Sequence, residues 1–200
     1  MTVGTHLGDW DPMTPREAAD LLDASSAPWW IAGGYAIDAF LGRPDRRPHD
    51  DLDVGLLARD QQAIRSCLVG WDLHCADPPR TLRRWRPGEH LDEPIHDVWA
   101  RERVDRPWRL QLVLNPGDDD TWTYRRDGRI RRPLSELVWR SEGVPYLAPE
   151  VQLLFKSKTV RAKDAQDFDD VLPKLDSTRR VWLREALSLT APGHPWLARL

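Results

Sequence analysis

The sequence predicts an α+β fold, with a mixed or antiparallel sheet flanked by helices and a C-terminal helical subdomain. Two observations support this prediction. Short apolar or alternating runs, bounded by glycine, proline and acidic residues, are typical of strands and recur before residue 133. Beyond residue 146, apolar residues recur at helical spacing. We therefore divide the chain into a sheet-containing core, residues 1–132, and a helical subdomain, residues 133–200.

The first elements are a helix and a strand that ends in two glycines. Residues 14–17, Thr-Pro-Arg-Glu, form a capping box with proline at the first helical position. The apolar run 29–32 predicts a strand. Gly33 and Gly34 follow it directly and allow a tight turn into a second helix, which ends at Gly42. Phosphate oxygens bind readily at helix N-termini, so Gly33 and Gly34 are candidate nucleotide-binding residues.

A second strand is predicted to carry two carboxylates, Asp51 and Asp53. Alternate residues of a strand face the same way, so both acids would lie on one face while Leu52 and Val54 meet the core. Paired carboxylate oxygens commonly hold Mg²⁺. We therefore expect Asp51 and Asp53 to be metal ligands and catalytic residues, with Mg²⁺ as the cofactor of phosphoryl or nucleotidyl transfer.

The loop before this strand is basic. Arg43, Arg46 and Arg47 lie in it, and they either neutralise phosphate charge or form a solvated basic loop. Arg47 is a candidate nucleotide-binding residue. His49 is a second candidate, which either donates a hydrogen bond to a phosphate or orients the loop.

The order of these features resembles the core motif of the DNA polymerase β-like nucleotidyltransferase superfamily. The resemblance covers residues 28–57, with a partial echo at residues 149–168, and residues 31–43 are similar to the opening of small bacterial aminoglycoside and lincosamide nucleotidyltransferases. It implies a nucleotidyltransferase-type sheet in residues 1–132. It also implies Mg²⁺-dependent transfer of a nucleoside monophosphate from a nucleoside triphosphate, ATP first, to a hydroxyl of an aminoglycoside-like antibiotic, with release of pyrophosphate.

The resemblance implies a third carboxylate on a later strand, where this chain departs from the pattern. The alternating run 108–114 offers Gln111, which can bind a metal or nucleotide through its carbonyl oxygen but cannot act as a base. Asp97, on a neighbouring predicted strand, is the first candidate to replace it as a catalytic residue. The acids at 118–120 are other candidates, and a surface position on an edge strand is the alternative for Asp97.

The C-terminal part is predicted to be helical from Tyr146 onward. Lys156 follows an apolar helix face, and a lysine is a compact charge suited to a triphosphate. We expect Lys156 to be a nucleotide-binding residue, the alternative being an ordinary lysine on a helix surface. The acidic run 164–170 either attracts a polycationic acceptor or is a solvated face. Trp196 is expected to dock the C-terminal tail.

Composition narrows the possible partners. The formal net charge of −3 argues against a non-specific nucleic-acid binder, and no 18-residue apolar stretch or signal-peptide pattern occurs in the sequence. We therefore expect a cytoplasmic protein that binds a nucleoside triphosphate and a small-molecule acceptor, with no membrane partner. Two alternatives stay open: a toxin-like nucleotidyltransferase acting on tRNA or protein, for which the basic segment 80–86 is the only hint, and a catalytically inactive nucleotide-binding module.

Overall fold

The computed structural model describes residues 7–44, 46–77 and 81–200, and these residues have an α+β fold. In this part of the chain the main sheet has eight strands, in the order β10-β11-β1-β2-β6-β5-β3-β4. They are β1 (Trp29–Ile31), β2 (Asp53–Leu57), β3 (Asp72–Asp77), β4 (Thr81–Arg84), β5 (Asp97–Arg101), β6 (Leu110–Asn115), β10 (Val138–Ser141) and β11 (Val144–Leu147). A second sheet is formed by β7 (Gly117–Asp118), β8 (Thr121–Thr123) and β9 (Arg131–Pro133).

The main sheet is mixed, as the sequence predicts. The pairs β1–β11 and β2–β6 are parallel, and the other neighbours are antiparallel. The register places Asp53 of β2 beside Gln111 of β6, and Val113 of β6 beside Asp97 of β5. Directly paired residues share a sheet face, so Asp53, Gln111 and Asp97 all lie on one face.

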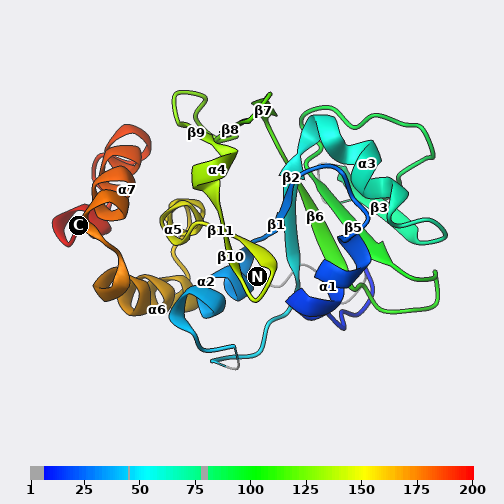
Figure 1. The fold of residues 1–200 in the computed structure, drawn as a ribbon, viewed down its shortest axis with the longest axis horizontal. Helices are drawn as coiled ribbons and strands as arrows, with labels where there is room; N and C mark the ends of the chain where they lie inside the picture. Colours follow the sequence, from blue (N-terminus) through cyan, green and yellow to red (C-terminus); the bar gives the residue numbers. More distant parts are fainter. Residues whose placement is uncertain (1–6, 45, 78–80) are drawn as a thin grey trace.

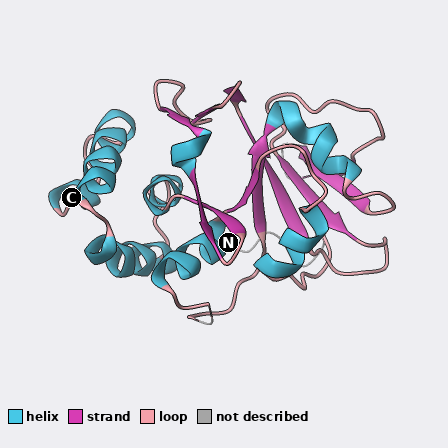
Figure 2. Ribbon diagram, in the orientation of Figure 1, coloured by secondary structure: helices cyan, strands magenta, loops and turns pink. Residues whose placement is uncertain are grey.

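The helix that follows β1 and the C-terminal helices gather at one end of the sheet, beside β1 and β11 (Figures 1 and 2). The α-helices are α1 (Pro15–Leu22), α2 (Gly33–Leu41), α3 (Gln61–Ser66), α4 (Leu134–Leu137), α5 (Pro149–Lys156), α6 (Ala162–Val171) and α7 (Ser177–Thr190). Short 3₁₀ turns are η1 (Ala58–Asp60), η2 (Leu172–Lys174) and η3 (Pro195–Ala198). Helix α5 contacts α2, α6 and α7, so the C-terminal helices pack directly on the helix that begins at the two glycines.

Local signals fix the first two helices. Thr14 accepts a hydrogen bond from the Glu17 amide and Glu17 accepts one from the Thr14 amide, so the predicted capping box is confirmed. Gly42 ends α2 in the left-handed conformation, with φ 67°, and its amide donates to Ala39. Both helix boundaries therefore follow from the sequence.

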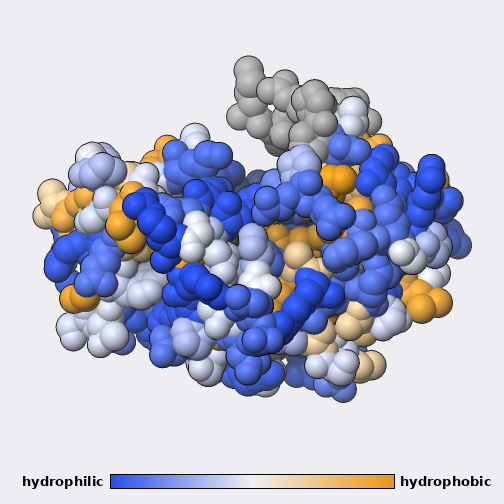
Figure 3. Space-filling view, turned by 90° about the horizontal axis from the view of Figure 1, so that it is seen from above, coloured by the Kyte–Doolittle hydropathy of each residue, from blue (hydrophilic) through white to orange (hydrophobic). Residues whose placement is uncertain are grey.

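The tryptophans of this chain serve mainly as core residues. Trp30, Trp85, Trp108 and Trp122 are fully buried, and Trp196 stacks on Phe168 with ring centroids 4.2 Å apart, which confirms that it docks the tail. Hydrophilic side chains cover most of the face seen in Figure 3. The most exposed large apolar residues of the described chain are separate in sequence: Val69, Val104, Val160, Val181 and Leu189. No helix in the described residues is both long and apolar enough to cross a membrane.

Two sequence expectations differ from the structure. Strand β2 begins at Asp53, so Asp51 lies in the loop before it and not on the strand. Tyr146 belongs to β11, because residues 144–147 pair with β1 and β10, and the helical region begins at Pro149. Strand β4 forms one edge of the sheet and pairs antiparallel with β3. The division at residue 132 stays a prediction, although β10 and β11 beyond it join the main sheet.

Candidate active site

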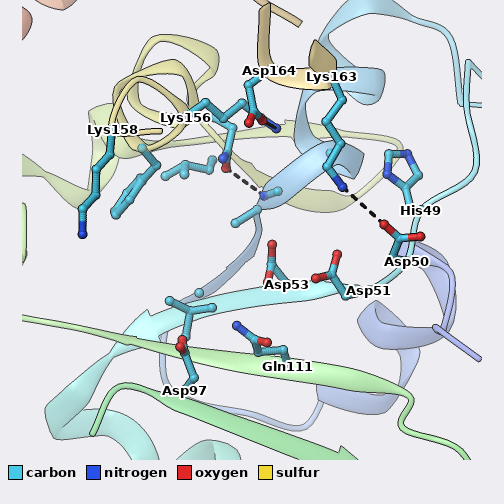
Figure 4. A pocket seen from close by; sticks show the side chains of 18 of the residues that line it. His49, Asp50, Asp51, Asp53, Asp97, Gln111, Lys156, Lys158, Lys163 and Asp164 are labelled. Atoms are coloured by element: carbon cyan, nitrogen blue, oxygen red, sulfur yellow. Dashed lines mark hydrogen bonds and ion pairs between the residues drawn. The ribbon is translucent and has the colours of Figure 1, made fainter. Parts of the chain in front are cut away.

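A cavity of about 410 Å³ opens where the sheet meets the C-terminal helices. One wall carries the carboxylates of Asp51, Asp53 and Asp97, together with Gln111, and Figure 4 shows them on the strand side. The opposite wall is cationic and comes from the end of α5, the start of α6 and the segment between them. Its side chains are Lys156, Lys158, Arg161 and Lys163. The acids on the strand side therefore lie opposite basic side chains of the helical side, where Asp164 also lines the cavity.

The carboxylates of the acidic wall repel one another. Burial, with the nearby carboxylates of Asp51 and Asp97, raises the pKa of Asp53 to about 8. Neither Asp51 nor Asp53 makes an ion pair with any residue that the structure describes. Such a carboxylate pair lacks a neutralising partner of its own, and a cation is the ligand that would relieve it.

These residues fit a magnesium ion by their chemistry. Mg²⁺ is usually held by one or two carboxylates, with water and substrate phosphates completing its shell. Among residues 7–44, 46–77 and 81–200, no three His, Cys, Asp or Glu side chains converge closely enough to form a metal site alone. The carboxylates of Asp51 and Asp53 therefore suit a shared site that a phosphate would complete, rather than an all-protein cage.

Gly33 makes room for this wall. It has φ 68°, a conformation that glycine adopts most readily, and a Cβ at this position would overlap Oδ2 of Asp53. Its amide donates a 2.7 Å hydrogen bond to Oε1 of Gln152, a buried residue of α5. The Gly33 amide thus has a protein acceptor in this structure, and phosphate binding there stays a prediction.

Gly34 has a similar steric role toward the basic loop. A Cβ on Gly34 would fall 2.6 Å from Nη2 of Arg47 and would also overlap the ring of His49. Both glycines line the cavity, as do Arg47 and His49. The sequence therefore identified residues that the fold brings together at one cavity, and the glycines leave space there for the side chains of Asp53, Arg47 and His49.

His49 contacts other residues of the protein, and its role as a nucleotide-binding residue stays a prediction. Its Nε2 lies 2.7 Å from Oδ2 of Asp38, and its ring lies against Tyr35 with centroids 4.1 Å apart. Burial lowers the pKa of His49, although the Asp38 carboxylate opposes this shift. Asp38, buried in α2, was not recognised from the sequence as part of this site.

Arg46 and Arg47, which the sequence treats alike, have different environments. The guanidinium of Arg46 lies among three carboxylates: Asp38 at 2.8 Å, Asp170 at 2.8 Å, and Asp167. It is therefore committed to protein partners and does not line the cavity. Arg47 does line the cavity, and its Nη2 lies 3.5 Å from Asp167.

Lys156 is buried, so the alternative of an ordinary surface lysine is wrong. Its Nζ lies 3.0 Å from Asp164 and 2.8 Å from Asp167 at the edge of the cavity. Burial opposes ionisation of Asp164, but hydrogen bonds from Arg161 and Lys156 outweigh it and lower the pKa of Asp164 to about 2. The two acids of α6 thus hold Lys156 in place.

This ion network explains the acidic run 164–170. Asp164 and Asp167 are fully buried and face Lys156, Arg46 and Arg161. The expectation of a solvated acidic face is wrong for these two residues, because they neutralise cations inside the protein. Lys163 adds a further tie, since its Nζ lies 3.3 Å from Asp50 in the loop before Asp51 (Figure 4). In the sequence, the available signal for this ion network was an arginine-rich loop at 43–47 and an acidic run at 164–170.

Asp97 and Gln111 both line the cavity. Asp97 therefore does not occupy an isolated edge-strand surface, and its charge contributes to raising the pKa of Asp53. Arg125 also lines the cavity and was missed from the sequence, where it is one of several arginines in a turn. Its position depends on how the second sheet packs, so no local pattern could have identified it.

Comparison with known proteins agrees with this geometry. A family model described as aminoglycoside-2''-adenylyltransferase matches residues 16–75, which include both glycines, Asp51 and Asp53. No curated protein matches the chain. A crystal structure of ANT(2")-Ia in complex with adenylyl-2"-tobramycin is 15% identical over 88% of this chain and 95% of that chain, with a TM-score of 0.53.

A solution structure of the antibiotic-resistance factor ANT(2'')-Ia gives a similar result. It is 18% identical over 88% of each chain, also with a TM-score of 0.53. At these identities the likeness establishes the fold. Together with the match over residues 16–75, it confirms the resemblance to aminoglycoside nucleotidyltransferases.

Proposed function

We propose that this protein transfers a nucleoside monophosphate from a nucleoside triphosphate, ATP in the first instance, to a hydroxyl of an aminoglycoside-like antibiotic. Pyrophosphate is released, and Mg²⁺ is required. One observation carries the proposal: the carboxylates of Asp51, Asp53 and Asp97 face a row of cations across a single cavity. A polyanionic substrate with a divalent cation complements both walls of such a cavity.

Asp51 and Asp53 are the residues that would hold the magnesium. When bound, Mg²⁺ neutralises the two carboxylates and stabilises charge on phosphate oxygens. The raised pKa of Asp53 supports this assignment, because a carboxylate that resists ionisation alone gains most from a bound cation. Gly33 keeps the space beside Asp53 free of side-chain atoms.

The cationic wall binds and orients the triphosphate. Lys158 and Lys163 reach the cavity from the α5–α6 segment, and Arg47 reaches it from the loop before β2. Fixing the triphosphate against this wall aligns its α-phosphorus with the acidic wall. Orientation of this kind can supply a large part of the rate enhancement of a group-transfer reaction.

Asp97 is the proposed general base. It lies on β5, on the same sheet face as Asp53, and lines the cavity, so its carboxylate is available to accept the proton of an acceptor hydroxyl. Gln111 lies between β2 and β5, where its amide positions substrate oxygens without exchanging a proton. Asp97→Asn should lower kcat by about a hundredfold or more, while Gln111→Glu should leave substantial activity.

Two observations support an aminoglycoside-like acceptor: the similar solved structure and the charge of the cavity. The solved relative is described with an adenylylated tobramycin, and the exposed Asp50 and the acidic wall give this cavity negative groups for amino-sugar ammoniums. A basic channel for a macromolecule has weaker support. Within the segment 80–86, Arg83 pairs with Asp77 and Glu89, Arg84 pairs with Asp72, and Arg80 lies outside the described residues.

The test is pyrophosphate release by the purified protein with Mg²⁺, each of the four ribonucleoside triphosphates, and a panel of aminoglycosides and lincosamides. Release should require a drug and should disappear in Asp51→Asn. The control is Asp105→Asn, an exposed acid paired with Arg103 away from the cavity. Drug-independent release stimulated by tRNA or protein would instead support a macromolecular acceptor, and Mg²⁺-dependent triphosphate binding without any release would support an inactive module.

A further inference from the structure

Arg125 lies in a hydrogen-bonded turn at the edge of the cavity. The turn follows β8 and is closed by backbone hydrogen bonds, from the Tyr124 amide to the Ile130 carbonyl at 2.9 Å and from the Asp127 amide to the Tyr124 carbonyl at 3.0 Å. The buried Tyr124 ring packs edge-on against Phe155 of α5, with centroids 5.0 Å apart. These contacts fix the backbone at Arg125.

The neighbours of Arg125 have protein partners. Arg126 donates to the Phe155 carbonyl at 2.9 Å, and Arg129 donates to the Asp127 carboxylate at 2.6 Å. On the opposite wall, Lys156, Arg161 and Lys163 are each paired with an aspartate. In the described residues Arg125 has neither an ion pair nor a hydrogen bond, and its Nε is buried without an acceptor.

This isolation is unusual because Arg125 is partly buried beside acids. Burial lowers the pKa of Arg125, and the charges of Asp97 and Asp53 oppose that shift. A buried guanidinium normally has each donor satisfied by a carboxylate, a carbonyl or water. Arg125 instead lines the cavity with its side chain free of partners among the described residues, close enough to Asp97 and Asp53 for their charges to affect it.

We propose that Arg125 binds a phosphate group of the nucleotide, an inference that rests on the proposed function. The planar guanidinium presents parallel N–H donors that match two phosphate oxygens, and charge-assisted bonds of this kind are strong. Because Arg125 lies beside Asp97 and Asp53, the phosphate it binds is adjacent to the reacting centre. Arg125 and the α5–α6 cations then hold the polyphosphate from two sides.

The test measures binding without catalysis. Calorimetry with Mg²⁺ compares inorganic pyrophosphate, tripolyphosphate and AMP as ligands of the wild-type protein, Arg125→Met and Arg125→Lys. Arg125→Met should weaken binding by about tenfold or more, and Arg125→Lys by less, because lysine keeps the charge but loses the bidentate geometry. Loss with pyrophosphate assigns Arg125 to the leaving group, and loss with AMP assigns it to the transferred phosphate.

Arg129→Met is the matched control. Arg129 belongs to the same turn but is exposed, contacts Asp127, and does not line the cavity. It should bind all three ligands as the wild type does. Equal binding by Arg125→Met and wild type would overturn the inference, and so would equal losses in Arg125→Met and Arg129→Met, since these would mean that the turn and not the guanidinium matters.

The two proposals fail in different ways. Polyphosphate binding that depends on Arg125, in a protein that releases no pyrophosphate with any acceptor, would leave the Arg125 inference standing and remove the proposed reaction. Drug-dependent pyrophosphate release with a KM for the triphosphate that is unchanged in Arg125→Met would retain the reaction and remove the inference.

Discussion

Gly33 and Asp53 are in such close contact that any side chain on Gly33 would overlap the carboxylate of Asp53. Gly33 is the first residue of α2 and Asp53 is the first residue of β2, so the contact joins the two motifs that are separated by the basic loop. The glycine therefore has two requirements, a positive φ and an empty side-chain position. This relationship leads to the first prediction.

Gly33→Ala should abolish nucleotidyl transfer and weaken Mg²⁺ binding, because the new Cβ must displace the Asp53 carboxylate. The strained φ should also cost about 1–2 kcal/mol of unfolding free energy. Gly88→Ala is the control, since Gly88 has a similar φ of 74° and a Cβ added there would meet no atom within 4 Å. Urea unfolding and Mg²⁺-dependent pyrophosphate release measure the two effects. Similar loss of activity in both variants would refute the steric explanation.

Asp53→Asn should stabilise the metal-free protein at high pH. The folded pKa of Asp53, about 8, exceeds the value of about 3.9 for an unfolded aspartate, so the native state holds an extra proton between these values. Wild-type stability should therefore fall as the pH rises from about 4 to 8, and then level off.

The measurement is urea unfolding in EDTA at pH 6 and pH 9. Wild type should lose at least about 1 kcal/mol more between these pH values than Asp53→Asn does. Asp105→Asn, which changes an exposed acid, should retain the wild-type pH dependence. A pH dependence that is the same in Asp53→Asn and wild type would exclude Asp53 as the titrating group.

Lys156→Met should destabilise the protein by about 3 kcal/mol, because it leaves the carboxylates of Asp164 and Asp167 buried without their shared cation. Lys158→Met, two residues further on, changes an exposed side chain and should alter stability by less than about 0.5 kcal/mol. Thermal or urea unfolding of the two variants makes the comparison. Equal stability of both would mean that the ion network contributes little.

Arg46→Met should also destabilise the protein by about 3 kcal/mol and should reduce turnover, since Arg46 ties the loop that ends at Asp51 to α6. Arg43→Met is the matched control: Arg43 lies in the same loop, is exposed and does not line the cavity. Unfolding and pyrophosphate release at saturating triphosphate should separate the pair. If Arg43→Met lost as much activity as Arg46→Met, general loop charge and not the α6 contact would be responsible.

The residues that the sequence identified correctly were those with local patterns. The capping box at Thr14 and the left-handed cap at Gly42 depend on contacts within a few residues, and both are present. The glycine pair and the acids of the second motif are also local signals, and they share one cavity. Local propensity predicts such features because their energies depend on neighbouring residues.

The sequence did not determine which charges are paired. Arg46 and Arg47 are adjacent and chemically identical, yet Arg46 binds Asp38 and two acids of α6, whereas Arg47 lines the cavity. The sequence left Lys156 as a nucleotide-binding residue or a surface lysine, but it is buried between Asp164 and Asp167. Pairing over more than a hundred residues follows from how α6 packs against α2, which no local pattern encodes.

By itself, the sequence determined the α+β class, the helix boundaries set by caps, and the glycine and Asp51–Asp53 motifs that line the cavity. Only the tertiary structure decided that Asp97 shares a sheet face with Asp53, because that depends on the strand order β2-β6-β5, and that Arg125 lines the same cavity. The physical reason is how far apart along the chain the interacting residues lie. Capping and strand alternation are fixed by neighbours along the chain, whereas burial and charge pairing are fixed by residues that meet only after the sheet and helices have packed.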